Sequence, residues 1–83
     1  MIIINQQPVM ECALDMLTEL VQHKTIILLA RGDSIPTAVA IANVLTENML
    51  KGNSKIQNIE VDSECPKGNA MVSIIKITVT KTN

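Results

Sequence analysis

The side chains that could support catalysis or bind a metal are few and widely separated. His23 is the only histidine, so it is the only possible base for the serines, and it lies where a helix is expected to end. Cys12 and Cys65 are far apart, and one His with two separated Cys does not build a zinc site without unusual carboxylate ligands. The three glycines are scattered and form no glycine-rich phosphate-binding motif. We therefore expect no enzyme activity, no metal, no cofactor and no small-molecule substrate.

Three carboxylates, Glu60, Asp62 and Glu64, alternate along one face of a predicted strand. Neighbouring carboxylates can act as general acid and base when a dry, enclosed setting makes the two groups differ. An outward strand face provides no such setting. A second acidic line, formed by Glu11, Asp15 and Glu19 at i, i+4 and i+8, follows the outer face of a predicted helix. It is a solvated surface, a surface that repels phosphates, or a docking face for a basic partner.

One arginine has a well-defined position. Residues 26–30 are all apolar, which predicts a short strand buried on both faces. Arg31 and Gly32 end this strand, and Asp33 or Ser34 can cap the helix that follows. The strand thus delivers one guanidinium to a strand-to-helix turn. Alternatively, Arg31 only caps the strand end or pairs with Asp33.

The remaining pattern predicts an α/β fold with the element order β-α-β-α-β-β, a two-layer sandwich formed by one domain over residues 1–83. A brief strand at residues 1–4 precedes a helix that starts at Pro8, and a second helix runs from about Ile35 to Leu50. Residues 59–62 and 75–80 alternate as strands of a hairpin whose tip includes residues 65–69. Helical crossovers predict that the first three strands are parallel neighbours.

The apolar content exceeds what one small core needs. Apolar residues make up 47% of the chain although aromatic residues are absent, and self-association commonly stabilises a small core. The second predicted helix carries an apolar arc wider than one sheet face requires. We therefore place a dimer interface on this helix, at Ile41, Val44, Leu45 and Met49.

The formal net charge of −1 counts against nucleic-acid binding, which normally shows a basic footprint, although it does not exclude a local basic patch. The first residues lack the charged segment of a signal peptide, and no apolar run approaches the length of a membrane span. We expect a cytoplasmic protein with reduced thiols and no membrane partner.

Three stretches of the chain together form a recognisable pattern. They are residues 4–17 (INQQPVMECALDML), Ala30-Arg31-Gly32 with Ile35 and Ala38-Val39, and residues 72–77 (VSIIKI). In these stretches the chain resembles the Alba family of archaeal chromatin and RNA-binding proteins. The resemblance implies the fold derived above, a homodimer and a nucleoid-associated setting. It also implies sequence-tolerant binding of duplex DNA or RNA, with the two hairpin arms of the dimer reaching along the minor groove.

By this resemblance, six residues lie beside the nucleic acid. The residues that would flank the phosphates are Gln6, Gln7, Arg31 and Gly32. Those that would lie at the hairpin tip are Lys67 and Asn69.

The chain also departs from the family pattern. The glutamine pair replaces a lysine pair, Asp33 and Thr37 replace basic residues, and the hairpin contains no arginine. These losses leave a second hypothesis open, namely an Alba-like subunit that mainly binds other proteins. Such a subunit would form a heterodimer with a more basic family member and bind nucleic acid weakly or not at all.

Overall fold

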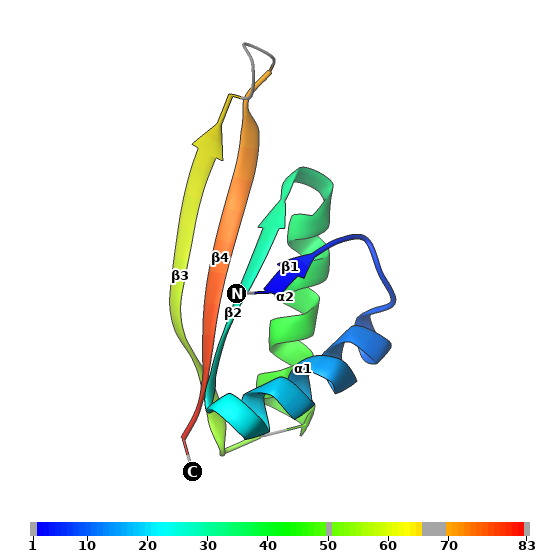
Figure 1. The fold of residues 1–83 in the computed structure, drawn as a ribbon, viewed down its shortest axis with the longest axis vertical. Coiled ribbons are helices and arrows are strands. Elements are labelled where there is room, and N and C mark those ends of the chain that lie inside the picture. The colour runs from blue at the N-terminus through cyan, green and yellow to red at the C-terminus, as the bar shows by residue number, and fades with distance from the viewer. Residues whose placement is uncertain (1, 50, 66–69, 83) are drawn as a thin grey trace.

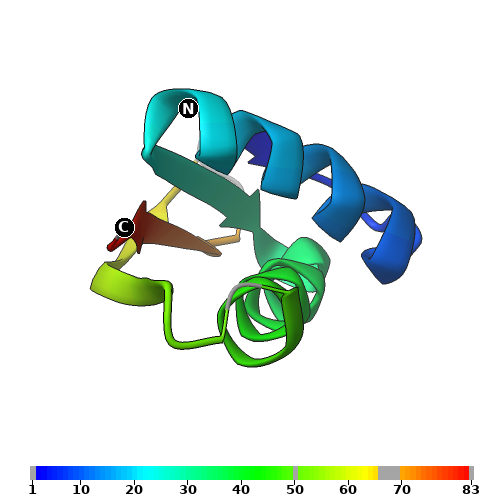
Figure 2. The ribbon, with the colours of Figure 1, turned by 90° about the horizontal axis from the view of Figure 1, so that it is seen from below.

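A four-stranded sheet forms the centre of the molecule, and both helices cover the same face of it (Figures 1 and 2). The computed structural model describes residues 2–49, 51–65 and 70–82. The elements in chain order are β1 (Ile2–Ile4), α1 (Val9–His23), β2 (Thr25–Arg31), a 3₁₀ turn η1 (Gly32–Ser34), α2 (Ile35–Val44), a π-helical segment η2 (Leu45–Met49), β3 (Ser54–Glu64) and β4 (Val72–Lys81). The predicted order β-α-β-α-β-β is confirmed.

The strand order in the sheet is β1-β2-β4-β3. β1 is parallel to β2 as predicted, but β4 lies between β2 and β3 and is antiparallel to both. The prediction that the third strand neighbours the first two was therefore wrong. The physical reason is burial, since Ile75, Ile77 and Val79 of β4 enter the core, whereas Ile59 and Val61 of β3 stay exposed.

Only one face of the sheet is covered, which corrects the prediction that β2 is buried on both faces. Ile26, Leu28 and Ala30 point towards the helices and are buried, while Ile27 and Leu29 are half-buried on the opposite face. We call this opposite face, which none of the described helices covers, the open face. An apolar run without polar alternation does not reveal which of its two faces a helix covers.

The core lies between the sheet and the two helices. Its helical side chains are Cys12, Ala13, Met16, Leu20, Ala38, Ile41, Ala42 and Leu45. Ile41 and Leu45 are completely buried within the single chain, so they leave no surface for a second subunit. Their assignment to a dimer interface was therefore wrong. Val44 and Met49 are half-buried and still offer some surface on that side.

The second helix differs from its predicted form at both ends. Neither Asp33 nor Ser34 makes a side-chain cap, because the 3₁₀ turn leads directly into α2 and Ser34 already has helical dihedral angles. At the other end the α-helical pattern stops at Val44, and a π-helical segment follows. There the Thr46 hydroxyl donates a hydrogen bond to the Ala42 carbonyl at 2.9 Å. None of the described helices has both the length and the apolar character needed to cross a membrane.

We predict that Leu28→Ala lowers the free energy of unfolding by about 2–5 kcal/mol, because it opens a cavity at the centre of the core. Leu28 is 0% exposed and pairs with Ile2 on one side and Ile77 on the other. The matched control is Ile3→Ala on β1, where the side chain is 68% exposed and the expected loss is about 0.5 kcal/mol or less. Urea unfolding followed by circular dichroism measures both, and equal losses would contradict this packing.

Candidate functional site

Two loops meet at one end of the sheet. Because β1 and β2 are parallel, the chain leaves both strands at the same end of the sheet, through residues 5–8 after β1 and through residues 31–34, which begin with the last residue of β2. The side-chain amide of Gln6 donates a hydrogen bond to the Asp33 carbonyl at 3.4 Å and joins the two loops. We call residues 5–8 and 31–34 the rim. A hollow of about 230 Å³ lies beside it, lined by Ile3, Ile4, Asn5, Leu29, Arg31 and Ser34.

Gln7 is engaged within its own loop. Its side-chain oxygen accepts a hydrogen bond from the Asn5 amide at 3.0 Å, and its side chain also hydrogen-bonds Cys12. Burial and the negative charge of Asp15 raise the pKa of the Cys12 thiol, and the hydrogen bond from Gln7 partly opposes them. Cys12 is therefore a protonated core residue at neutral pH. Gln7 shapes the entry to α1, while Gln6 links the rim, and neither brings a charge.

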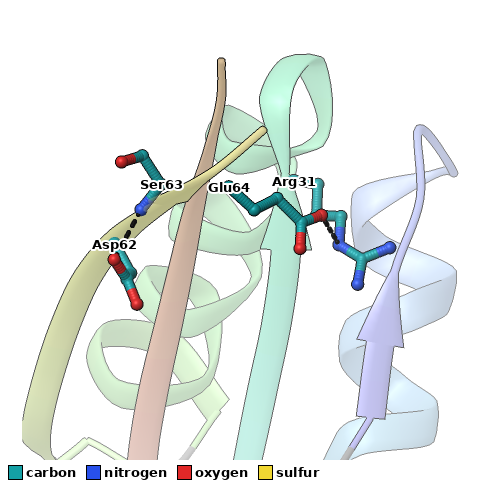
Figure 3. Close-up of polar contacts among 4 residues, drawn as sticks. All are labelled: Arg31, Asp62, Ser63 and Glu64. Atoms are coloured by element: carbon teal, nitrogen blue, oxygen red, sulfur yellow. Dashed lines mark hydrogen bonds and ion pairs between the residues drawn. The ribbon is translucent and has the colours of Figure 1, made fainter. Parts of the chain in front are cut away.

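Arg31 is the cation of the rim. Its side chain is 62% exposed, and its Nε lies 3.1 Å from the Oε1 of Glu64, the last residue of β3 (Figure 3). Within the described part of the chain, Arg31 thus forms its ion pair with Glu64. The sequence had suggested Asp33 as a possible partner instead. The guanidinium reaches this carboxylate across β4, which lies between the two strands.

The register of the sheet explains why Glu64 is the partner. Arg31 and Asp62 both lie opposite Ile74 of β4, one from each side, so all three share the open face. Asp62 turns back to its own strand, where its Oδ1 accepts a hydrogen bond from the Ser63 amide at 2.7 Å (Figure 3). Glu64 is two residues further along the same face and is free to turn towards Arg31. The alternation of residues 60–64 indicated the shared face, but only the register shows which carboxylate meets the arginine.

Gly32 allows the chain to turn away from the sheet directly after Arg31. Its φ of +50° lies in the left-handed region that favours glycine. Space is not the constraint, because an added Cβ would lie 3.7 Å from Val72 Cγ1, an ordinary contact. Any other residue here would strain the turn that holds Arg31 at the rim.

The hairpin of β3 and β4 forms a long arm that projects past the helices (Figure 1). Lys67 and Asn69, the predicted contacts at its tip, lie outside the described residues. On the open face of the arm, Lys76 Nζ lies 4.0 Å from Glu60 Oε2. The sequence interpretation did not single out Lys76, because an outward lysine on an alternating strand carries no distinguishing signal.

The described residues contain no group of three His, Cys, Asp or Glu side chains arranged to hold a metal ion. His23, the single histidine, lies at the end of α1, where its Nε2 is 3.4 Å from Glu19 Oε2 of the preceding turn. This contact is an exposed i, i+4 pair on a helix surface. The rim combines one arginine, a glutamine link between two loops and a hollow beside them.

Comparison with known proteins agrees with this geometry. The Alba family model matches residues 1–63, well over half of the chain. The solved structure of Alba from Thermoplasma volcanium has a TM-score of 0.83 and 28% sequence identity, and the match covers 96% of this chain and 98% of that chain. The structural match therefore also includes the part of the chain beyond residue 63. The chain belongs to the Alba family, a nucleic-acid-binding architectural family rather than a family of enzymes.

Proposed function

We propose that this protein binds the phosphate backbone of DNA or RNA without reading the base sequence, with the rim as the contact surface. The observation that supports this most directly is an exposed guanidinium held at the point where two loops converge. Arginine offers planar, paired donors that suit a phosphate. Gln6 belongs to the same rim and can contribute a neutral donor. Catalysis plays no part in this function.

The composition limits how such binding works. Aromatic residues are absent, so stacking of bases on aromatic side chains makes no contribution. The net charge is −1, and the glutamines of the rim release no counterions. Affinity then depends on a small number of cationic contacts, and we expect weak binding that salt readily disrupts.

We predict that Arg31→Ala weakens binding to all sequences alike and reduces the magnitude of the salt slope by about 0.9, the value for one phosphate contact on duplex DNA. Fluorescence anisotropy with labelled duplex DNA and single-stranded RNA, each at several salt concentrations, measures both effects. Lys55→Ala is the matched control, because it removes the same charge near the start of β3, at the opposite end of the sheet from the rim. No binding by the wild type at low salt, or equal effects of the two variants, would contradict the proposal.

A dimer would place two rims on one assembly, and an exposed apolar surface supports this part of the proposal. Ile59 and Val61 lie opposite Ile77 and Ile75, so they face the helical side of the sheet, yet they are 51% and 73% exposed. The helices cover β2 and β4 but leave these two side chains of β3 open. We propose that a second copy covers this surface together with the half-buried Val44 and Met49.

We predict that Ile59→Asp converts a dimer into a monomer, because a carboxylate would be buried at the contact. Light scattering coupled to size exclusion measures the mass of each species. Ile3→Asp introduces the same charge at an exposed residue of β1 and should leave the dimer intact. A wild-type monomer at working concentration, or a dimer that tolerates Ile59→Asp, would show that this surface does not join two copies.

A second candidate function, binding to a basic protein partner, is favoured by the outer surface of α1. Met10, Leu14 and Val21 are exposed, and with the half-buried Leu17 they follow one stripe at i, i+4, i+7 and i+11. Residues 11, 15 and 19, all acidic, run beside this stripe, and α1 contains no Lys or Arg. An apolar stripe flanked by carboxylates suits an amphipathic helix with basic edges.

We predict for this second candidate that a labelled amphipathic Leu/Lys helical peptide binds the wild type and binds Leu14→Asp at least tenfold more weakly, roughly the cost of desolvating the added charge. Fluorescence anisotropy of the peptide measures this. Met71→Asp, at an exposed residue before β4, is the control. Peptide binding that is unchanged in Leu14→Asp would exclude the stripe as a docking site.

A further inference from the structure

The ion pair between Arg31 and Glu64 gives the rim an internal competitor for phosphate. Resting on the proposed function, we infer that Glu64 sets the affinity of this site by opposing the contact between Arg31 and the nucleic-acid backbone. A carboxylate and a phosphate recognise the guanidinium through the same kind of charged hydrogen bond. Glu64 occupies part of that recognition surface before any ligand arrives.

The position of Glu64 singles it out among the carboxylates of the open face. Glu60 lies near Lys76, and Asp62 accepts a hydrogen bond from the Ser63 amide, so each is engaged elsewhere. Glu64 alone among these three carboxylates contacts the arginine of the rim. Removing the charge of Glu64 therefore has an effect that removing the charge of its neighbours does not.

The contact is one-sided, which decides how the competition works. Glu64 meets the Nε of Arg31, and Figure 3 shows the two terminal guanidinium nitrogens beyond the central carbon, one on the side of β1 and the other pointing along the sheet. A phosphate can therefore approach these nitrogens without first displacing the carboxylate. It meets a cation whose charge is already neutralised, and it is repelled by Glu64 next to it. The carboxylate lowers affinity without closing the site.

The pair is exposed enough to yield to a ligand. The side chains of Arg31 and Glu64 are 62% and 38% exposed, and exposed ion pairs are weak and screened by salt. Glu64 is also the last residue of β3, at the end of this strand that leads to the hairpin tip. A phosphate bound to the terminal nitrogens of Arg31 would repel Glu64 and so weaken the ion pair that links the end of β3 to the rim.

The test is Glu64→Gln, which removes the charge but keeps a side-chain oxygen that can accept the Arg31 hydrogen bond. We expect the dissociation constant for a labelled mixed-sequence DNA duplex to fall about twofold to fivefold, the range set by an exposed ion pair. Glu60→Gln is the matched control, since it makes the same charge change on the same strand and face. Both substitutions are repeated in an Arg31→Ala background to form double-mutant cycles.

The expected result is that the gain from Glu64→Gln shrinks in the Arg31→Ala background to about the size of the Glu60→Gln effect, which is the same in both backgrounds. The NMR signal of the Arg31 Nε–H in the ligand-free protein should also shift in Glu64→Gln and stay in place in Glu60→Gln.

Equal gains from the two substitutions, or a gain from Glu64→Gln that keeps its full size without Arg31, would overturn the role of Glu64 and leave the proposed function standing. If neither the wild type nor Glu64→Gln binds DNA or RNA at low salt, the proposed function itself is wrong, and Glu64 has no phosphate to oppose.

Discussion

Burial of β4 between β2 and β3 is the constraint on which the rest of the structure depends. Its alternating residues Ile75, Ile77 and Val79 complete the core beneath the two helices, and this fixes the register on both sides. One consequence is that the last residue of β2 and the last residue of β3 share the open face. Arg31 and Glu64 thus meet because of how the core packs, although they are far apart in the sequence.

The rim is not strongly basic, because its positive and negative charges nearly balance. The fold presents one guanidinium beside a neutral glutamine, and the arm supplies a carboxylate that offsets it. In a chain with a net charge of −1, this balance favours weak and salt-sensitive contact with a phosphate backbone. The exposed apolar residues of β3 offer a surface for a second copy. Such a dimer would carry two rims, and this would raise the avidity of a site that binds weakly by itself.

Local sequence patterns predicted the helices and strands well, but they did not predict which strands pair with each other in the sheet. The apolar run before Arg31 indicated β2, and the alternation of residues 75–80 indicated which side of β4 is buried. The same patterns did not reveal that β4 separates β2 from β3, since strand order depends on which strand buries more apolar surface. Ile41 and Leu45 were taken for interface residues because a wide apolar arc does not distinguish its core side from its outer side. The contact between Arg31 and Glu64 could be identified only from the register of the strands in the sheet.

The most direct measurement of the central claim is a titration of the ¹⁵N-labelled protein with a short DNA duplex at low salt, followed by ¹H–¹⁵N NMR. If the rim is the contact surface, the largest shifts occur at the backbone amides of residues 5–7 and 31–34 and at the Arg31 Nε–H. Shifts confined to the outer face of α1, or no shifts at all, would contradict it.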